Sequence, residues 1–97
     1  MNTMLNSTNV PNIYDFLKEN YGFSQPVVMQ LIEKLRTAPN SEIYVGRVTG
    51  SSIYRIAVGD LNLPYVLKFR TPTERDRFMM SFEKICTDMG RQVIKSY

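Results

Sequence analysis

The chain has 97 residues, a formal net charge of +3 and 43% hydrophobic residues, which is the composition of one small globular domain. No uninterrupted apolar run exceeds three residues, whereas a membrane-spanning helix needs about 20 and the core of a secretion signal about 7 to 15. The sequence contains no His and one Cys. Histidine catalysis, zinc sites built on His or several Cys, and an internal disulfide are therefore excluded, and we expect a cytoplasmic protein.

The N-terminal part of the sequence predicts a tail and two short helices. Residues 1–10 carry no charge and show no hydrophobic period, so we expect a flexible tail before a single domain over residues 11–97. Pro11 suits the first turn of a helix that Gly22 ends. Ser24 caps a second helix, whose buried stripe has helical spacing: Val28, Leu31, Ile32 and Leu35. This second helix must end before Pro39.

Three strand-like segments follow, at residues 43–48, 53–58 and 65–69, each rich in β-branched and aromatic residues. Between the first two, Gly50 occupies the first central position of a two-residue loop. Glycine at that position is typical of a type II′ turn, which here pairs Val48 with Ile53. Paired residues share a face of a sheet. This register predicts one core-facing set of side chains: Ile43, Val45, Tyr54, Ile56, Val58, Tyr65, Leu67 and Phe69.

The outer face of this predicted sheet carries cations and no acid. Arg55, Lys68 and Arg70 lie there with Tyr44 and several β-branched residues, whereas strands that face solvent ordinarily mix both signs of charge. Two explanations remain open: the helix pair covers part of this face, or the face is a recognition surface. Tyr44, Arg55, Lys68 and Arg70 are the candidate binding residues, because Arg and Tyr anchor many interfaces.

The C-terminal part predicts a long amphipathic helix. Thr71 is a good N-cap, Pro72 suits the first position and Glu74 completes a capping box. The apolar stripe of the helix contains Phe78, Phe82, Ile85, Cys86 and Met89. Gly90 leaves two alternatives, a stop followed by a tail or short fourth strand, or a helix that continues to Lys95; we favour the stop.

These elements give the order α-α-β-β-β-α. The fold class is therefore α+β, with two short N-terminal helices, a three-stranded antiparallel β-meander and a long C-terminal helix.

Residues 13–58 resemble the core of a winged helix-turn-helix DNA-binding domain. The resemblance rests on Phe16-Leu17 in a first helix, the corner at residues 22–26, the second helix and the hairpin that follows. It implies that the second helix enters the major groove and that the hairpin forms the wing. The outward residues of that helix would be Met29, Gln30, Glu33 and Thr37.

The sequence contains no recognisable catalytic or cofactor site. Its acids are scattered, it has no glycine-rich phosphate loop, and Cys86 falls on an apolar stripe where a thiol acts as a small hydrophobe. We therefore expect a non-enzymatic binding protein without cofactor or metal. Its expected role is that of an inhibitor, adaptor or regulator that engages an acidic protein surface. Nucleic-acid binding and a structural role in a homo-oligomer remain as alternatives, and no membrane partner is expected.

Overall fold

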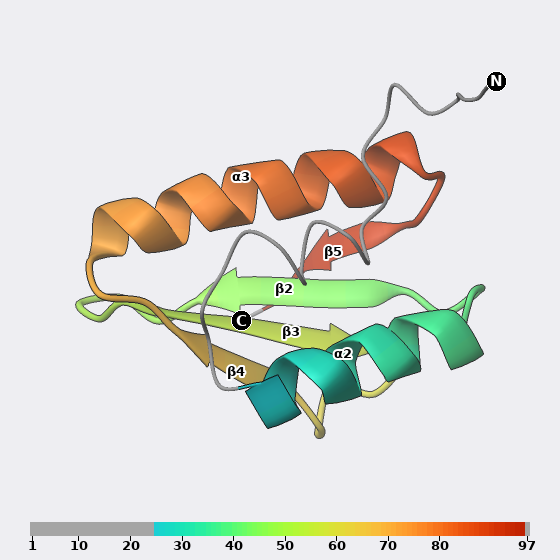
Figure 1. Ribbon diagram of the computed structural model, residues 1–97. Coiled ribbons are helices and arrows are strands. Elements are labelled where there is room, and N and C mark those ends of the chain that lie inside the picture. The colour runs from blue at the N-terminus through green and yellow to red at the C-terminus, as the bar shows by residue number, and fades with distance from the viewer. Residues whose placement is uncertain (1–24, 97) are drawn as a thin grey trace, which may run out of the picture.

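The computed structural model describes residues 25–96 (Figure 1). The elements are α2 (Gln25–Thr37), β2 (Ile43–Arg47), β3 (Ile53–Val58), β4 (Tyr65–Lys68), α3 (Pro72–Asp88) and β5 (Val93–Lys95). The class is α+β, as predicted, and the long C-terminal helix and the second short helix are present. The predicted tail and first helix lie outside the described residues.

The described strands form one four-stranded mixed sheet in the order β4-β3-β2-β5. β2, β3 and β4 make the predicted antiparallel meander. β5 pairs with β2 in parallel, so the sheet has one more strand than the meander and is not purely antiparallel. In Figure 1 the chain leaves β4, runs along α3 and returns to β5 beside β2, which is the crossover that parallel strands require.

The β2–β3 hairpin has the predicted register but a different turn. Arg47 pairs with Tyr54, and the Val48 N–H donates to the Ile53 carbonyl at 3.1 Å. The turn is closed by the Ser51 N–H, which donates to the Val48 carbonyl at 3.2 Å. Gly50, with a φ of 76°, therefore occupies the third position of a Val48–Ser51 turn and not the first central position of a type II′ turn. Both turns require a positive φ at residue 50, although Gly50 is the second residue of one turn and the third residue of the other. The predicted register is therefore correct although the predicted turn type is not.

One face of the sheet and both described helices enclose the core. All eight predicted core-facing strand residues are buried or packed against the core. α2 contributes Val28, Leu31, Ile32 and Leu35, and α3 contributes Phe78, Phe82, Ile85 and Cys86. α2 therefore lies on the core face beside α3. The expectation that the predicted helix pair covers the outer face is therefore wrong for α2. The apolar stripe of α2 packs against the core face of the sheet, which is the face that α3 also covers.

Both ends of α3 follow from local sequence signals. The Thr71 hydroxyl accepts a hydrogen bond from the Glu74 N–H at 3.1 Å, and Pro72 occupies the first turn. At the other end, Gly90 has a φ of 81°, and the Arg91 N–H donates to the Cys86 carbonyl at 2.9 Å. This is a Schellman stop, so the favoured alternative at Gly90 is confirmed and the helix does not continue to Lys95.

Arg91 also ties the end of α3 to the end of α2. Its guanidinium donates to the carbonyl oxygens of Leu35, Ala38 and Ser41 at 3.4, 2.9 and 3.3 Å. The last carbonyls of a helix have no partner within the helix, and a cation near them also suits the helix dipole. Arg91 thereby caps α2 from a position more than fifty residues further along the chain.

Candidate binding face

The outer face is the side of the sheet opposite α2 and α3. Strand alternation and the pairing register place on it Tyr44, Gly46, Val48, Ile53, Arg55, Ala57, Val66, Lys68 and Ile94. Ile94 is an addition that the sequence did not predict, because it depends on the parallel pairing of β5 with β2. The four strands contain no acidic residue.

Tyr44, Arg55 and Lys68 lie on one diagonal across three strands. Arg55 pairs with Gly46 of β2 and with Val66 of β4. Tyr44 is two residues from Gly46, and Lys68 is two residues from Val66 on the opposite side. Each step between diagonal neighbours is roughly 7–8 Å. Three of the four candidate binding residues are therefore brought together as a line of one aromatic and two cationic side chains.

Arg70 does not join this line. It lies beyond the end of β4, and its guanidinium donates to Glu74 on α3 at 3.0 Å. The side chain is 88% exposed, so the ion pair is a surface contact. Glu74 belongs to α3, which lies on the side of the sheet opposite the outer face. The ion pair with Glu74 therefore directs the Arg70 guanidinium away from the outer face.

Exposure increases across the outer face toward β4. Ala57 on β3 is buried, and Tyr44, Gly46 and Arg55 are half-buried. On β4, Val66 is 41% exposed and Lys68 is exposed as well. The most accessible part of the face is therefore the strand at the edge of the sheet.

Most described acids lie in the helices, where they contact cations. Glu33 bonds Arg36, and on α3 the pairs include Lys84–Asp88 at 3.0 Å, as expected from their spacing. Among described residues outside the helices, only Glu42 and Asp60 are acidic, and each lies beside a strand end. The Asp60 carboxylate accepts the Asn62 N–H at 2.9 Å, in the local role expected of a turn residue. The two layers thus differ in charge: mixed in the helices and cationic in the strands.

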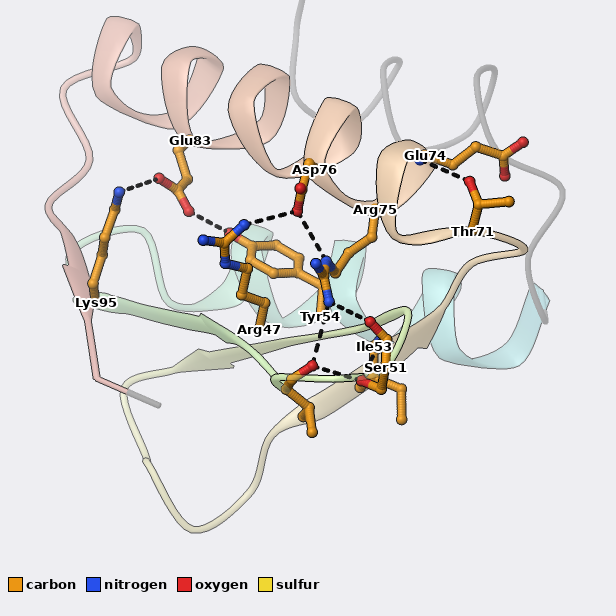
Figure 2. A network of polar contacts seen from close by, with 11 residues as sticks. Arg47, Ser51, Ile53, Tyr54, Thr71, Glu74, Arg75, Asp76, Glu83 and Lys95 are labelled. Atoms are coloured by element: carbon orange, nitrogen blue, oxygen red, sulfur yellow. Dashed lines mark hydrogen bonds and ion pairs between the residues drawn. The ribbon is translucent and has the colours of Figure 1, made fainter.

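A buried arginine fastens α3 to the hairpin, as Figure 2 shows. Arg75 is 6% exposed and donates from Nη1 to the carbonyl oxygens of Val48 and Ser51. Its Nε donates to Asp76 at 3.0 Å, and Arg47 of β2 donates to the same carboxylate oxygen at 3.1 Å. The hydrogen bond from Arg75, with a smaller contribution from Arg47, lowers the pKa of Asp76 although partial burial acts in the opposite direction.

A second polar contact lies further along α3 (Figure 2). The buried Tyr54 donates its hydroxyl hydrogen to Glu83 at 2.8 Å, and Lys95 of β5 lies 3.5 Å from the other oxygen of that carboxylate. Burial first, and then the charge of Glu83, raise the pKa of Tyr54 far above its usual value. These contacts hold the helix layer on the sheet. They lie on the core side of the sheet, whereas Tyr44, Arg55 and Lys68 lie on the outer face.

The described residues contain no group of three His, Cys, Asp or Glu side chains that could hold a metal ion. Cys86 is buried, and desolvation raises its pKa to about 12, which is the behaviour of a structural thiol. Within residues 25–96, no helix is long and apolar enough to cross a membrane.

The outward residues of α2 are placed as the winged-helix resemblance implies. Met29, Gln30, Glu33 and Thr37 are all exposed. Glu33, however, holds Arg36 at 2.9 Å, and the Thr37 hydroxyl donates to the Glu33 carbonyl at 2.9 Å. The helix thus presents a carboxylate and an already bonded hydroxyl where phosphate contacts would be needed, and groove insertion stays a prediction.

Comparison with known proteins gives no significant match to a family model, a curated protein or a solved structure.

Proposed function

We propose that this chain is a non-enzymatic binding protein, an inhibitor, adaptor or regulator, which engages an acidic protein surface through its outer face. The observation that supports the proposal is the diagonal of Tyr44, Arg55 and Lys68 on a face whose strands carry no acid. Aromatic and cationic side chains next to aliphatic ones are typical of interface anchors. Cations on strands that contain no acid favour a partner of opposite charge and repel basic surfaces.

A charge-reversal pair tests the proposal. R55E/K68E places two acids on the outer face, whereas K34E/R77E makes the same change at two exposed positions of the helices. Each double variant moves the formal net charge from +3 to −1. The probe is a fluorescein-labelled polyglutamate peptide, followed by anisotropy. We expect R55E/K68E to lose roughly tenfold or more in affinity and K34E/R77E to lose far less. Circular dichroism checks that both variants are folded.

Two results would overturn the proposal. An equal loss in the two variants would mean that polyglutamate binding depends on net charge alone, and unchanged binding by folded R55E/K68E would show that the outer face takes no part in recognition.

A DNA duplex of about 20 base pairs, titrated in parallel at low and physiological salt, distinguishes nucleic-acid binding. DNA binding that persists at physiological salt, exceeds the peptide affinity and is lost in R55E/K68E would assign the same face to nucleic acid.

A further inference from the structure

β4 forms one edge of the sheet within the described part of the chain, where its neighbour is β3. The Phe69 N–H donates to the Ser52 carbonyl at 2.9 Å, so Ser52 and Phe69 form a hydrogen-bonded pair. Such pairs alternate along an antiparallel ladder. Leu67, which pairs with Tyr54, therefore directs its N–H and C=O toward β3, whereas Val66 and Lys68 direct theirs away from the sheet.

The two outer-face side chains of β4 are one aliphatic, Val66, and one cationic, Lys68. Val66 is 41% exposed, and Leu63, just before the strand, is 69% exposed. Lys68 is exposed too, and residues 61–73 contain no acid. The edge thus combines outward backbone groups, accessible aliphatic side chains and positive charge.

We infer that the β4 edge accepts an extended acidic and aliphatic peptide segment as an additional strand; the acidic class of partner rests on the proposed function. The backbone of the segment would bond the outward N–H and C=O groups of Val66 and Lys68. Because Val66 and Lys68 share the outer face, an aliphatic residue would lie beside Val66 and an acid beside Lys68. The partner surface would then continue from the edge onto the diagonal of Arg55 and Tyr44.

Charge argues against a second copy as the occupant. Antiparallel pairing of two β4 strands through the outward groups of Val66 and Lys68 would leave the two Lys68 side chains at diagonal positions of one face, roughly 7–8 Å apart, where like charges repel. A lysine on an edge strand is a common protection against such self-pairing. An acidic segment turns the same lysine into a favourable contact.

The test separates backbone pairing from charge. Val66→Pro removes an N–H that bonds nothing in β3, so the ladder to β3 stays intact, and proline is tolerated at such edge positions. Val66→Ala is the matched control, because it removes most of the side chain and keeps the N–H. The probe is a fluorescein-labelled peptide of about ten residues that repeats Val-Val-Glu-Glu, long enough for one strand, so that neighbouring residues on each face are one aliphatic and one acidic side chain. A second peptide of equal charge has prolines at alternate positions and cannot pair.

We expect the Val-Val-Glu-Glu peptide to bind at least roughly tenfold more tightly than the proline-containing one. Val66→Pro should abolish this preference, and Val66→Ala should retain most of it. In the wild-type chain, the peptide should slow hydrogen exchange at the Val66 and Lys68 amides, which tests the inference even if Val66→Pro does not fold.

Equal binding of both peptides, with no new protection at Val66 and Lys68, would overturn the inference. If R55E/K68E still loses polyglutamate binding in that case, the proposed function stands and only the added strand fails. If R55E/K68E binds polyglutamate as the wild type does, the proposed function fails as well. Concentration-dependent dimerisation that Val66→Pro removes would also overturn the inference, because it would make a second copy the occupant.

Discussion

The hydroxyl of Tyr54 lies 2.8 Å from Glu83 Oε2 and donates a hydrogen bond to it, joining β3 to α3. The ring is fully buried and makes edge-on contacts with Phe78 and Phe82, with centroid distances of 5.9 and 6.2 Å. A buried hydroxyl requires an acceptor, and Glu83 is the acid that α3 directs toward it. This contact therefore fixes how far along the sheet the helix lies.

Tyr54→Phe should lower the free energy of unfolding by about 1–2 kcal/mol, because Glu83 loses a donor while the ring contacts remain. Glu83→Gln should cost less, since an amide oxygen still accepts from the hydroxyl. Urea denaturation followed by circular dichroism measures both. A Tyr54→Phe protein as stable as the wild type would show that the hydrogen bond contributes nothing net.

Arg75→Met should be more damaging, with a loss of about 2–4 kcal/mol, because the Val48 and Ser51 carbonyls lose their shared buried donor. The stability of Arg75→Lys should lie between those of the wild type and Arg75→Met, since one ammonium group cannot donate in all the directions that a guanidinium does. Arg47→Gln is the control, because Arg47 is 53% exposed and its ion pair with Asp76 should be worth less than about 1 kcal/mol. Similar losses for Arg75→Met and Arg47→Gln would contradict the central role given to Arg75.

Asp76 predicts a stability change in acid. The guanidinium hydrogen bond from Arg75 lowers the pKa of Asp76 below its ordinary value of 3.8. The contribution of the carboxylate is therefore complete above that value and is lost as the pH falls below it. The stability difference between wild type and Asp76→Asn should shrink from pH 7 to pH 3. Asp60→Asn is the control variant, because it removes one acid outside the contacts of Arg75. The Asp60 carboxylate accepts a backbone hydrogen bond from Asn62. A difference that stays constant with pH would contradict this account.

Cys86 predicts slow thiol chemistry and a loss of stability in alkali. Burial raises the pKa of this thiol from 9.0 to about 12, so at pH 8 the folded chain holds roughly a thousandfold less thiolate than the unfolded chain. A disulfide reagent such as DTNB should react slowly until urea unfolds the protein, with Cys86→Ala as the blank. Because the pKa is raised, stability is unaffected below pH 9 and decreases as the pH rises above it. Fast labelling in native buffer would show that the thiol is accessible.

Much of the sheet could be predicted from the sequence because its information is local. Gly50 fixed the Val48–Ile53 register through its left-handed conformation, and the alternating strand residues then assigned both faces. The stop at Gly90 and the cap at Thr71 were equally local. The predicted type II′ turn at Gly50 was wrong, since a glycine with positive φ suits both that turn and the Val48–Ser51 turn that is present.

The remainder depends on contacts between distant segments. The parallel pairing of β5 with β2 follows from the path of α3 across the sheet, which three strand residues do not encode. Arg75 was missed as a structural residue, although it precedes Phe78 and Phe82 by three and seven positions on the same stripe. In the candidate site, the diagonal of Tyr44, Arg55 and Lys68 followed from register alone. The turning of Arg70 toward Glu74 depends on where α3 begins.

The placement of β5 also affects synthesis from the N-terminus. β2 is a central strand, yet one of its two neighbours is made only after α3 is complete. Until Val93–Lys95 leave the ribosome, the nascent chain exposes one side of β2 as an unsatisfied edge. The Lys95–Glu83 ion pair and the pairing of β5 with β2 can form only after that point.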